Sequence, residues 1–328
     1  MRSTHVCILI PLSLLILTVP VLHAAEDFRP IRLSEKWDLP AISAFGGLTG
    51  FMYRHGTLGF LSRDYSITVV DLSDPENPQT IGHINTLSRV SRPLGLAVVE
   101  NLLLIPLLEE GLKAFDISRL NDAEVVDFLP GIQGPWDVVA EDRWLHVATA
   151  YQAYQGIAIV DLSNMSSPRI VKRLPSSAFH LPQQDIPKGF HGDLTFTASL
   201  RLTENGFLFI LGVQQDSRTS RMITFYATVD IRNPKNPVVV DVYSAAGISP
   251  RMPTKAIGNR VFVTVQGGLD VFEVSNEGQI SKIGAIIPES RRAPKALSLP
   301  AVDGDTLYTA YFGLYYSSGP PRSPILEY

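Results

Sequence analysis

The sequence is poor in cysteine, in charged residues and in helix-forming segments. Its only cysteine among 328 residues is Cys7, which lies in an apolar N-terminal segment. The rest of the chain therefore forms no disulfide and offers no thiolate nucleophile or cysteine-ligated metal site. Hydrophobic residues make up 45% of the chain and charged residues 18%, which is typical of a folded globular protein. The fold must then be stabilised by packing.

The net charge is small and negative, and chemical motifs are absent. The formal charge is −4 at pH 7. General nucleic-acid binding needs a strong positive field, so this charge excludes that class of partner. The sequence contains no HExxH zinc motif, phosphate-binding loop, nucleophile elbow or dinucleotide fingerprint. We therefore predict no cofactor and no metal.

Residues 1–25 have the pattern of a secretory signal peptide. Arg2 gives a positive start, residues 6–22 are almost continuously apolar, and Ala24 and Ala25 are small residues suited to cleavage. We expect export to the periplasm, the cell surface or the medium. The alternative is that the segment is retained as an N-terminal anchor. No later segment is long and apolar enough to span a bilayer.

One phrase of about twelve residues recurs along the chain. Its clearest copies are ITVVDLSDPENP at 67–78, IAIVDLSNMSSP at 157–168 and YATVDIRNPKNP at 226–237. Weaker copies occupy 112–123 and 269–280, and the final PILEY resembles the first half of a sixth. The acid of each copy is Asp71, Asp116, Asp161, Asp230, Glu273 or Glu327, at intervals of 45, 45, 69, 43 and 54 residues. A period of about 40–50 residues is typical of β-propeller blades.

The residue types of the phrase favour a strand that stops abruptly. Val69 and Val70 prefer extended backbone. Asp71 is suited to accept hydrogen bonds from the backbone N–H groups just beyond it. Pro75 and Pro78 donate no backbone hydrogen bond, so the ladder ends there. We therefore interpret the six acids as structural residues.

A predicted hairpin precedes each phrase, with a turn pair at its tip between β-rich runs. The pairs are His55-Gly56, Glu100-Asn101, Glu141-Asp142, Asn205-Gly206, Gly258-Asn259 and Asp303-Gly304. Such pairs favour tight turns. Each repeat then contains four strands, the number in a propeller blade.

These repeats predict an all-β fold, a six-bladed β-propeller of four-stranded antiparallel blades. Residues 26–328 form one domain, and the N-terminal strand at 29–37 closes the last blade. Closure would remove the exposed edges of an open array. The alternative, an open solenoid, would need capping repeats. The predicted blades are 41–88, 89–130, 131–175, 176–245, 246–287 and 288–328.

The phrases resemble the LVIVD repeat family of bacterial surface and periplasmic proteins, whose consensus is L-x-I-V-D-[VI]-S-[DN]-P-x-x-P. The similarity extends over roughly residues 50–285, although the copies at 112–123 and 269–280 lack the proline pair and Glu273 replaces the aspartate. The resemblance implies a β-propeller that serves as a binding scaffold. It implies no catalytic residue.

Basic residues gather in the predicted connections between blades, just before each innermost strand. A ring of such cations at one opening would attract a carboxylate, a phosphate or an acidic surface. The alternative is that they are ordinary solvated charges. The candidate ligand-binding residues are Arg89, Arg92, Lys188, Arg251, Lys255, Arg291, Arg292 and Lys295, with Tyr151 and Tyr154 as aromatic contacts.

Two functions follow from this sequence. The first is an exported, non-catalytic, monomeric scaffold that docks a protein, a polysaccharide of the cell envelope or an anionic ligand on this basic, aromatic-rimmed face. The second is a hydrolase or lyase of the calcium-dependent propeller type, with a channel site at Asp137, His191 and Asp193. Inward polar residues commonly bind channel water, which favours the scaffold over the enzyme.

Overall fold

The computed structural model describes most of the repeat region and short parts of both ends. It covers residues 14–17, 31–33, 52–63, 66–74, 78–85, 95–120, 125–129, 131–150, 155–181, 186, 197–215, 222–245, 254–265, 268–288, 296–297, 301–303 and 306–312. Helical structure in these ranges is limited to two 3-10 turns, η2 (Ile117–Arg119) and η3 (Ser176–Ala178). The chain is therefore all-β, as the sequence predicted.

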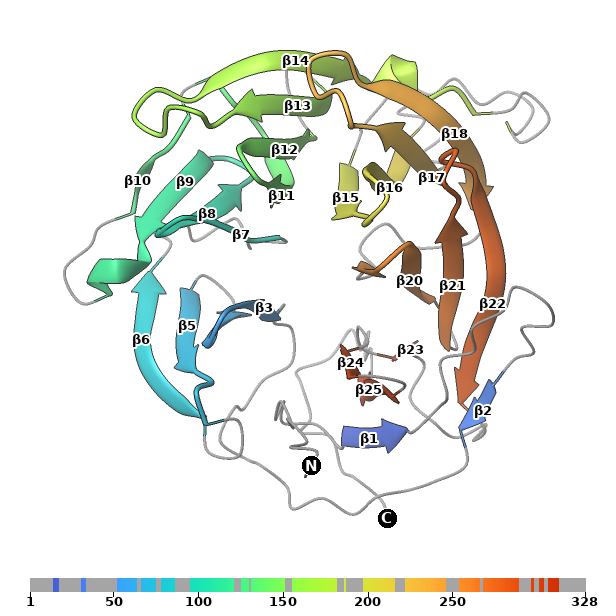
Figure 1. The fold of residues 1–328 in the computed structure, drawn as a ribbon, viewed down its shortest axis with the longest axis horizontal. Coiled ribbons are helices and arrows are strands. Elements are labelled where there is room, and N and C mark those ends of the chain that lie inside the picture. The colour runs from blue at the N-terminus through green and yellow to red at the C-terminus, as the bar shows by residue number, and fades with distance from the viewer. Residues whose placement is uncertain are drawn as a thin grey trace.

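Five blades, each built on four consecutive antiparallel strands, follow one another around a central axis (Figure 1). The first blade contains β3 (Met52–His55), β4 (Leu58–Arg63), β5 (Ser66–Asp71) and β6 (Gln79–Asn85). The second contains β7 (Ala97–Val99), β8 (Leu102–Leu107), β9 (Gly111–Asp116) and β10 (Val126–Asp127). The third contains β11 (Pro135–Glu141), β12 (Trp144–Thr149), β13 (Gly156–Asp161) and β14 (Arg169–Pro175).

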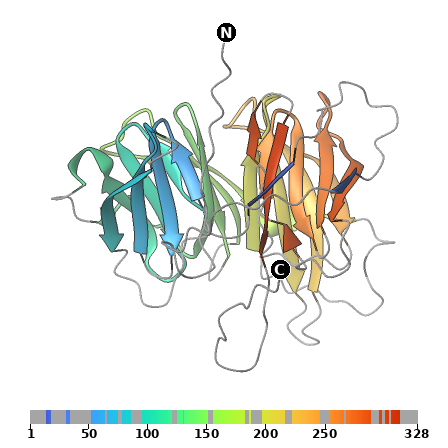
Figure 2. The same cartoon turned by 90° about the horizontal axis from the view of Figure 1, so that it is seen from below.

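The last two blades have the same order, with the first strand of each innermost. The fourth contains β15 (Thr197–Leu202), β16 (Phe207–Gln215), β17 (Met222–Asp230) and β18 (Val238–Ala245). The fifth contains β19 (Thr254–Ile257), β20 (Arg260–Val265), β21 (Gly268–Val274) and β22 (Ile280–Pro288). The strands run along the ring axis, so their turns lie on two opposite faces (Figure 2). The first strand of each blade begins on one face, and the hairpin tip that follows this strand lies on the other.

The prediction of six blades is wrong, because the structure has five. The remaining sheet combines β1 (Leu14–Leu17), β23 (Ala296–Leu297), β24 (Ala301–Asp303) and β25 (Thr306–Phe312). Its strands come from both ends of the chain, and β25 pairs with β1. The sheet therefore lacks the four consecutive strands of a blade. PILEY, the basis for a sixth repeat, lies outside the described residues.

The predicted closure by the N-terminal strand is also wrong. Only β2 (Ile31–Leu33) is described within 29–37, and it pairs in parallel with β22 of the fifth blade. A short outer strand fits the free edge of any neighbouring sheet, so its local pattern does not select the partner. The predicted signal peptide and domain limits stay predictions.

Four of the six phrase acids, the aspartates, act as the sequence predicted. Asp71, Asp116, Asp161 and Asp230 each accept a hydrogen bond from the backbone N–H two residues later, at N···O distances of 2.8–3.0 Å. Hydrogen bonds from these following residues lower the pKa of each carboxyl. These aspartates turn the chain from the third strand of a blade towards the fourth.

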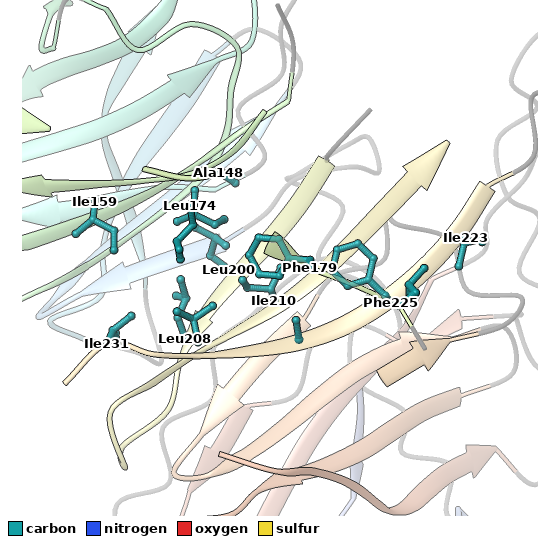
Figure 3. Close-up of a cluster of buried hydrophobic side chains, with 14 residues drawn as sticks. Ala148, Ile159, Leu174, Phe179, Leu200, Leu208, Ile210, Ile223, Phe225 and Ile231 are labelled. Atoms are coloured by element: carbon teal, nitrogen blue, oxygen red, sulfur yellow. The ribbon is translucent and has the colours of Figure 1, made fainter. Parts of the chain in front are cut away.

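Separate hydrophobic clusters join neighbouring blades. The cluster between the third and fourth blades contains Leu174, Phe179, Leu208 and Phe225, all buried (Figure 3). Similar clusters lie between the first and second, second and third, and fourth and fifth blades. Each cluster takes buried side chains from two blades, so the middle strands of the blades are mostly apolar. Packing between neighbouring blades therefore positions the inner strands around the axis.

Candidate functional site

A buried polar cluster joins the innermost strands of three blades. It contains Asp137 on β11, Ser199 and Arg201 on β15, and Thr254 on β19. Asp137 and Thr254 are 2% and 0% exposed, whereas the Arg201 side chain is 18% exposed. Polar side chains at such positions need partners, and these residues supply partners to one another.

Local structure directs these side chains to one place. The pairing of β11 with β12 shifts its register between Pro135 and Asp137, and such irregularities re-aim a side chain. Ser199 and Arg201 are two positions apart on β15, so they lie on the same side of that strand. Thr254 is the first residue of β19, next to the connection from the fourth blade.

The Asp137 carboxylate is saturated with donors. Its Oδ2 atom accepts from Ser199 Oγ at 3.1 Å, from the Leu200 backbone N–H at 2.8 Å, and from Arg201 Nη1 at 2.9 Å. Its Oδ1 atom accepts from the Val138 backbone N–H at 2.8 Å. A buried charge is tolerated when it is paired and hydrogen-bonded in this way. Asp137 therefore joins the third blade to the fourth.

Further contacts extend the cluster into the fifth and second blades. Arg201 Nε donates to the Thr254 carbonyl at 2.6 Å, and the Ser199 and Thr254 hydroxyls lie 2.9 Å apart. Gly95, just before β7, approaches so closely that a Cβ atom there would lie 1.6 Å from Asp137 Oδ1. Four consecutive blades thus meet around one carboxylate.

Lys255 adds a second cation beside Arg201. It follows Thr254 on β19, and its side chain is exposed. Partial desolvation by the surrounding protein, and then repulsion by Arg201, lower the pKa of Lys255. Among the described residues, Arg201 has Asp137 as its ion-pair partner and Lys255 has none. Within the part of the chain that the structure describes, the cluster therefore contains two cations and one carboxylate.

Only two of the predicted site residues are described, and they lie in the same region. Asp137, from the predicted channel site, contacts Arg201, and Arg201 influences Lys255, from the predicted basic face. The other candidates lie outside the described residues. They are Arg89, Arg92, Lys188, Arg251, Arg291, Arg292, Lys295, Tyr151, Tyr154, His191 and Asp193.

Sequence reasoning missed Ser199, Arg201 and Thr254. The available signal was two polar residues, Ser199 and Arg201, alternating with Leu200 and Leu202 in a predicted inner strand. Such alternation marks a side of a strand that faces something polar. Neither residue belonged to a motif, so no partner was predicted for them.

The described ranges contain no group of three or more histidine, cysteine, aspartate or glutamate side chains placed to hold a metal ion. No helix in these ranges is of a length and apolarity that would cross a bilayer.

Comparisons with known proteins find a matching repeat family and several similar solved structures. The LVIVD repeat family matches residues 62–86 and 138–174, which include strands of the first and third blades. Similar solved structures include a Lactobacillus plantarum protein, with 14% identity over 74% of this chain and 70% of that chain and a TM-score of 0.48. The periplasmic gluconolactonase PpgL of Pseudomonas aeruginosa has 16% identity over 78% of this chain and 70% of that chain, with a TM-score of 0.48. No curated protein matches the chain.

Proposed function

This chain is an LVIVD-repeat β-propeller, and from that premise we propose that it is an exported, non-catalytic scaffold that binds an anionic ligand at its inner opening. The observation that carries the proposal is the charge around Arg201. Asp137 forms an ion pair with Arg201, and Lys255 on β19 lies near enough to Arg201 to be repelled by its charge. An uncompensated cation in a partly desolvated setting attracts anions more strongly than one in bulk water.

The state of Asp137 supports binding over catalysis. A general base needs a lone pair free to take a proton from the substrate. The two Asp137 oxygens already accept four hydrogen bonds, one of them from a guanidinium group. In this proposal the carboxylate therefore links the third blade to the fourth and holds Arg201 in place.

The ligand class follows from the chemistry of the cations. Guanidinium and ammonium groups recognise carboxylates and phosphates. The predicted basic residues Arg251 and Arg292 precede β19 and β23 by a few residues in the sequence and would add to the same site. We propose carboxylate groups of an acidic polysaccharide of the cell envelope as the ligand.

Affinity electrophoresis in gels containing polygalacturonate tests the proposal. We expect the protein to be retarded by polygalacturonate and not by neutral dextran, and the retardation to weaken as salt is added. Lys255→Glu should abolish it. The control, Lys235→Glu, changes an exposed lysine in the turn between β17 and β18, on the opposite face, and should be retarded like the unmodified protein. Equal retardation of the Lys255→Glu protein would refute the proposed site.

Export needs a separate test. Residues 1–25, fused to an alkaline phosphatase that lacks its own signal, should give an enzyme active outside the cytoplasm. N-terminal sequencing of the exported chain should then begin at Ala25 or Glu26. A chain that keeps Arg2 and sediments with membranes would instead establish a retained anchor.

A further inference from the structure

One blade of the propeller carries an added strand on its outer edge. Residues 31–33 of β2 pair in parallel with residues 286–288 of β22, so the fifth blade becomes a five-stranded sheet (Figure 1). The edge strand of a sheet presents unpaired backbone N–H and C=O groups, which accept a further strand. The structure therefore shows an extended segment bound to the outer edge of a blade.

β18 is the equivalent outer strand of the fourth blade, and it lacks such a cover. Asp230 and Glu273 are the equivalent phrase acids of the two blades, and each ladder shifts its register just before its acid. Counted from these acids, residues 243–245 of β18 correspond to residues 286–288 of β22. Within the part of the chain that the structure describes, β18 pairs with β17 alone.

The sequence of β18 also lacks the features that protect an edge. Edge strands are commonly protected by short length, by charged side chains and by proline, and glycine weakens a strand. Among the other uncovered outer strands of the described blades, β10 has two residues, β14 carries Arg169, Lys172 and Arg173, and β6 contains Gly82. The eight residues of β18, VVVDVYSA, include no lysine, arginine, proline or glycine. This edge is therefore the one best suited to accept a strand.

Tyr243 supplies an aromatic anchor at this edge. It is 43% exposed, whereas the equivalent Ile286, beside β2, is 3% exposed. The Tyr243 ring stacks on Tyr226, with the centroids 6.1 Å apart, and meets Phe272 edge-on at 6.2 Å. A ring held in this way loses little side-chain entropy when a partner packs against it. Contact with Tyr243 therefore adds affinity to backbone pairing along β18.

We propose that the outer edge of β18 binds an extended peptide of a partner protein, which adds a parallel strand beside residues 243–245 as β2 does on β22. The peptide has large aliphatic residues at alternate positions, as in the Ile31-Arg32-Leu33 sequence of β2. Its backbone pairs with β18, in which every residue has an N–H group, and its aliphatic side chains contact Tyr243. This site is on the outer rim of the ring, so it is independent of the proposed anion site on the inner strands.

Fluorescence anisotropy with a labelled peptide tests the proposal. The probe is the blocked peptide DFRPIRLSEK, which has the sequence of residues 27–36. The control peptide carries N-methyl groups at the positions of Ile31 and Arg32. Consecutive N–H groups of a strand point to opposite sides, so one of the two methyl groups blocks pairing with β18. We expect the probe to bind and the control to bind at least about tenfold more weakly. Equal affinities, or no binding of the probe, would overturn the proposal.

Photo-cross-linking locates the bound peptide on the unmodified protein. Benzoylphenylalanine takes the position of Phe28 in the probe, and the labelled protein is digested with trypsin. We expect the label on the tryptic fragment 236–251, which contains β18. A label on fragment 283–291, which contains the end of β22, would show that the probe displaces β2 and would refute the assignment to β18.

Variants of the protein test the role of Tyr243. Tyr243→Lys should weaken binding of the probe about tenfold, since it removes the ring and places a charge on the edge. The control, Ile81→Lys, places the same charge on an exposed residue of β6 and should leave binding unchanged. Circular dichroism checks that both variants fold. Lys255→Glu, which tests the anion site, should bind the probe like the unmodified protein, so the two proposals fail separately. Unchanged binding by a folded Tyr243→Lys protein would refute the proposed anchor.

Discussion

His146 makes this propeller sensitive to moderate acid. Its side chain is fully buried on β12, and neither ring nitrogen has a hydrogen-bond partner among the described residues. Trp144 and Ala148, two positions away on either side, pack in the cluster between the third and fourth blades, so His146 faces the same cluster. Burial lowers its pKa from 6.5 to about 4. The folded protein therefore holds this ring in its neutral form.

The sign and size of the effect follow from the lowered pKa. Below pH 6.5 the unfolded chain takes up a proton at His146 that the folded chain rejects until about pH 4. The free energy of unfolding therefore does not depend on His146 protonation above pH 6.5, and it falls as the pH is lowered from 6.5 to about 4. One pH unit corresponds to about 1.4 kcal/mol, so the whole window represents about 3 kcal/mol of unfolding free energy.

Urea denaturation at pH 7.0, 5.5 and 4.5 measures this loss. His146→Leu removes the titrating ring and its unpartnered nitrogens, so we expect the variant to be at least as stable as the parent at pH 7. Its advantage should grow by about 3 kcal/mol towards pH 4. The control His83→Gln changes an exposed histidine of β6 and should follow the parent's pH dependence. A constant difference between the His146→Leu protein and the parent across this pH range would refute the reasoning.

Three further predictions concern the inter-blade cluster. Gly95→Ala should lower the free energy of unfolding by about 3 kcal/mol, because the new methyl group would overlap Asp137 Oδ1. Gly56→Ala should lower it by about 1 kcal/mol through its positive φ alone, since a Cβ atom there would meet nothing within 4 Å. Thermal denaturation of both variants checks this order. Asp137→Leu should lower the free energy of unfolding by about 3–5 kcal/mol, since it leaves the Arg201 charge unpaired. The Asp137→Leu, Arg201→Met double variant should lose less stability than the two single variants lose together. A double-mutant cycle in urea checks the coupling, and strictly additive losses would contradict it. Ser199→Ala should cost about 1 kcal/mol in the same assay, since Asp137 keeps its other donors.

Local features of the sequence determined the repeating unit. The β-branched pair, the aspartate and the prolines of each phrase act within a few residues of one another, so they fix a strand and its end without help from distant segments. The hydrogen bonds of Asp71, Asp116, Asp161 and Asp230 have the predicted local form. The turn pairs likewise predicted the hairpin at Glu100-Asn101, and they placed the next one within a residue of its observed tip at Asp142-Arg143, because a tight turn depends on the conformations of two residues.

Only the tertiary structure decided the number of blades, the partners of the terminal strands and the polar cluster. Strand pairing at an edge depends on which sheet lies nearby, so β2 joins β22 and β1 joins β25 without a distinguishing local pattern. Asp137, Arg201 and Thr254 are more than 50 residues apart in sequence and meet only because their blades share one axis. The alternation of Ser199 and Arg201 with leucines indicated a polar neighbour, but it did not identify Asp137, because that partner comes from another blade.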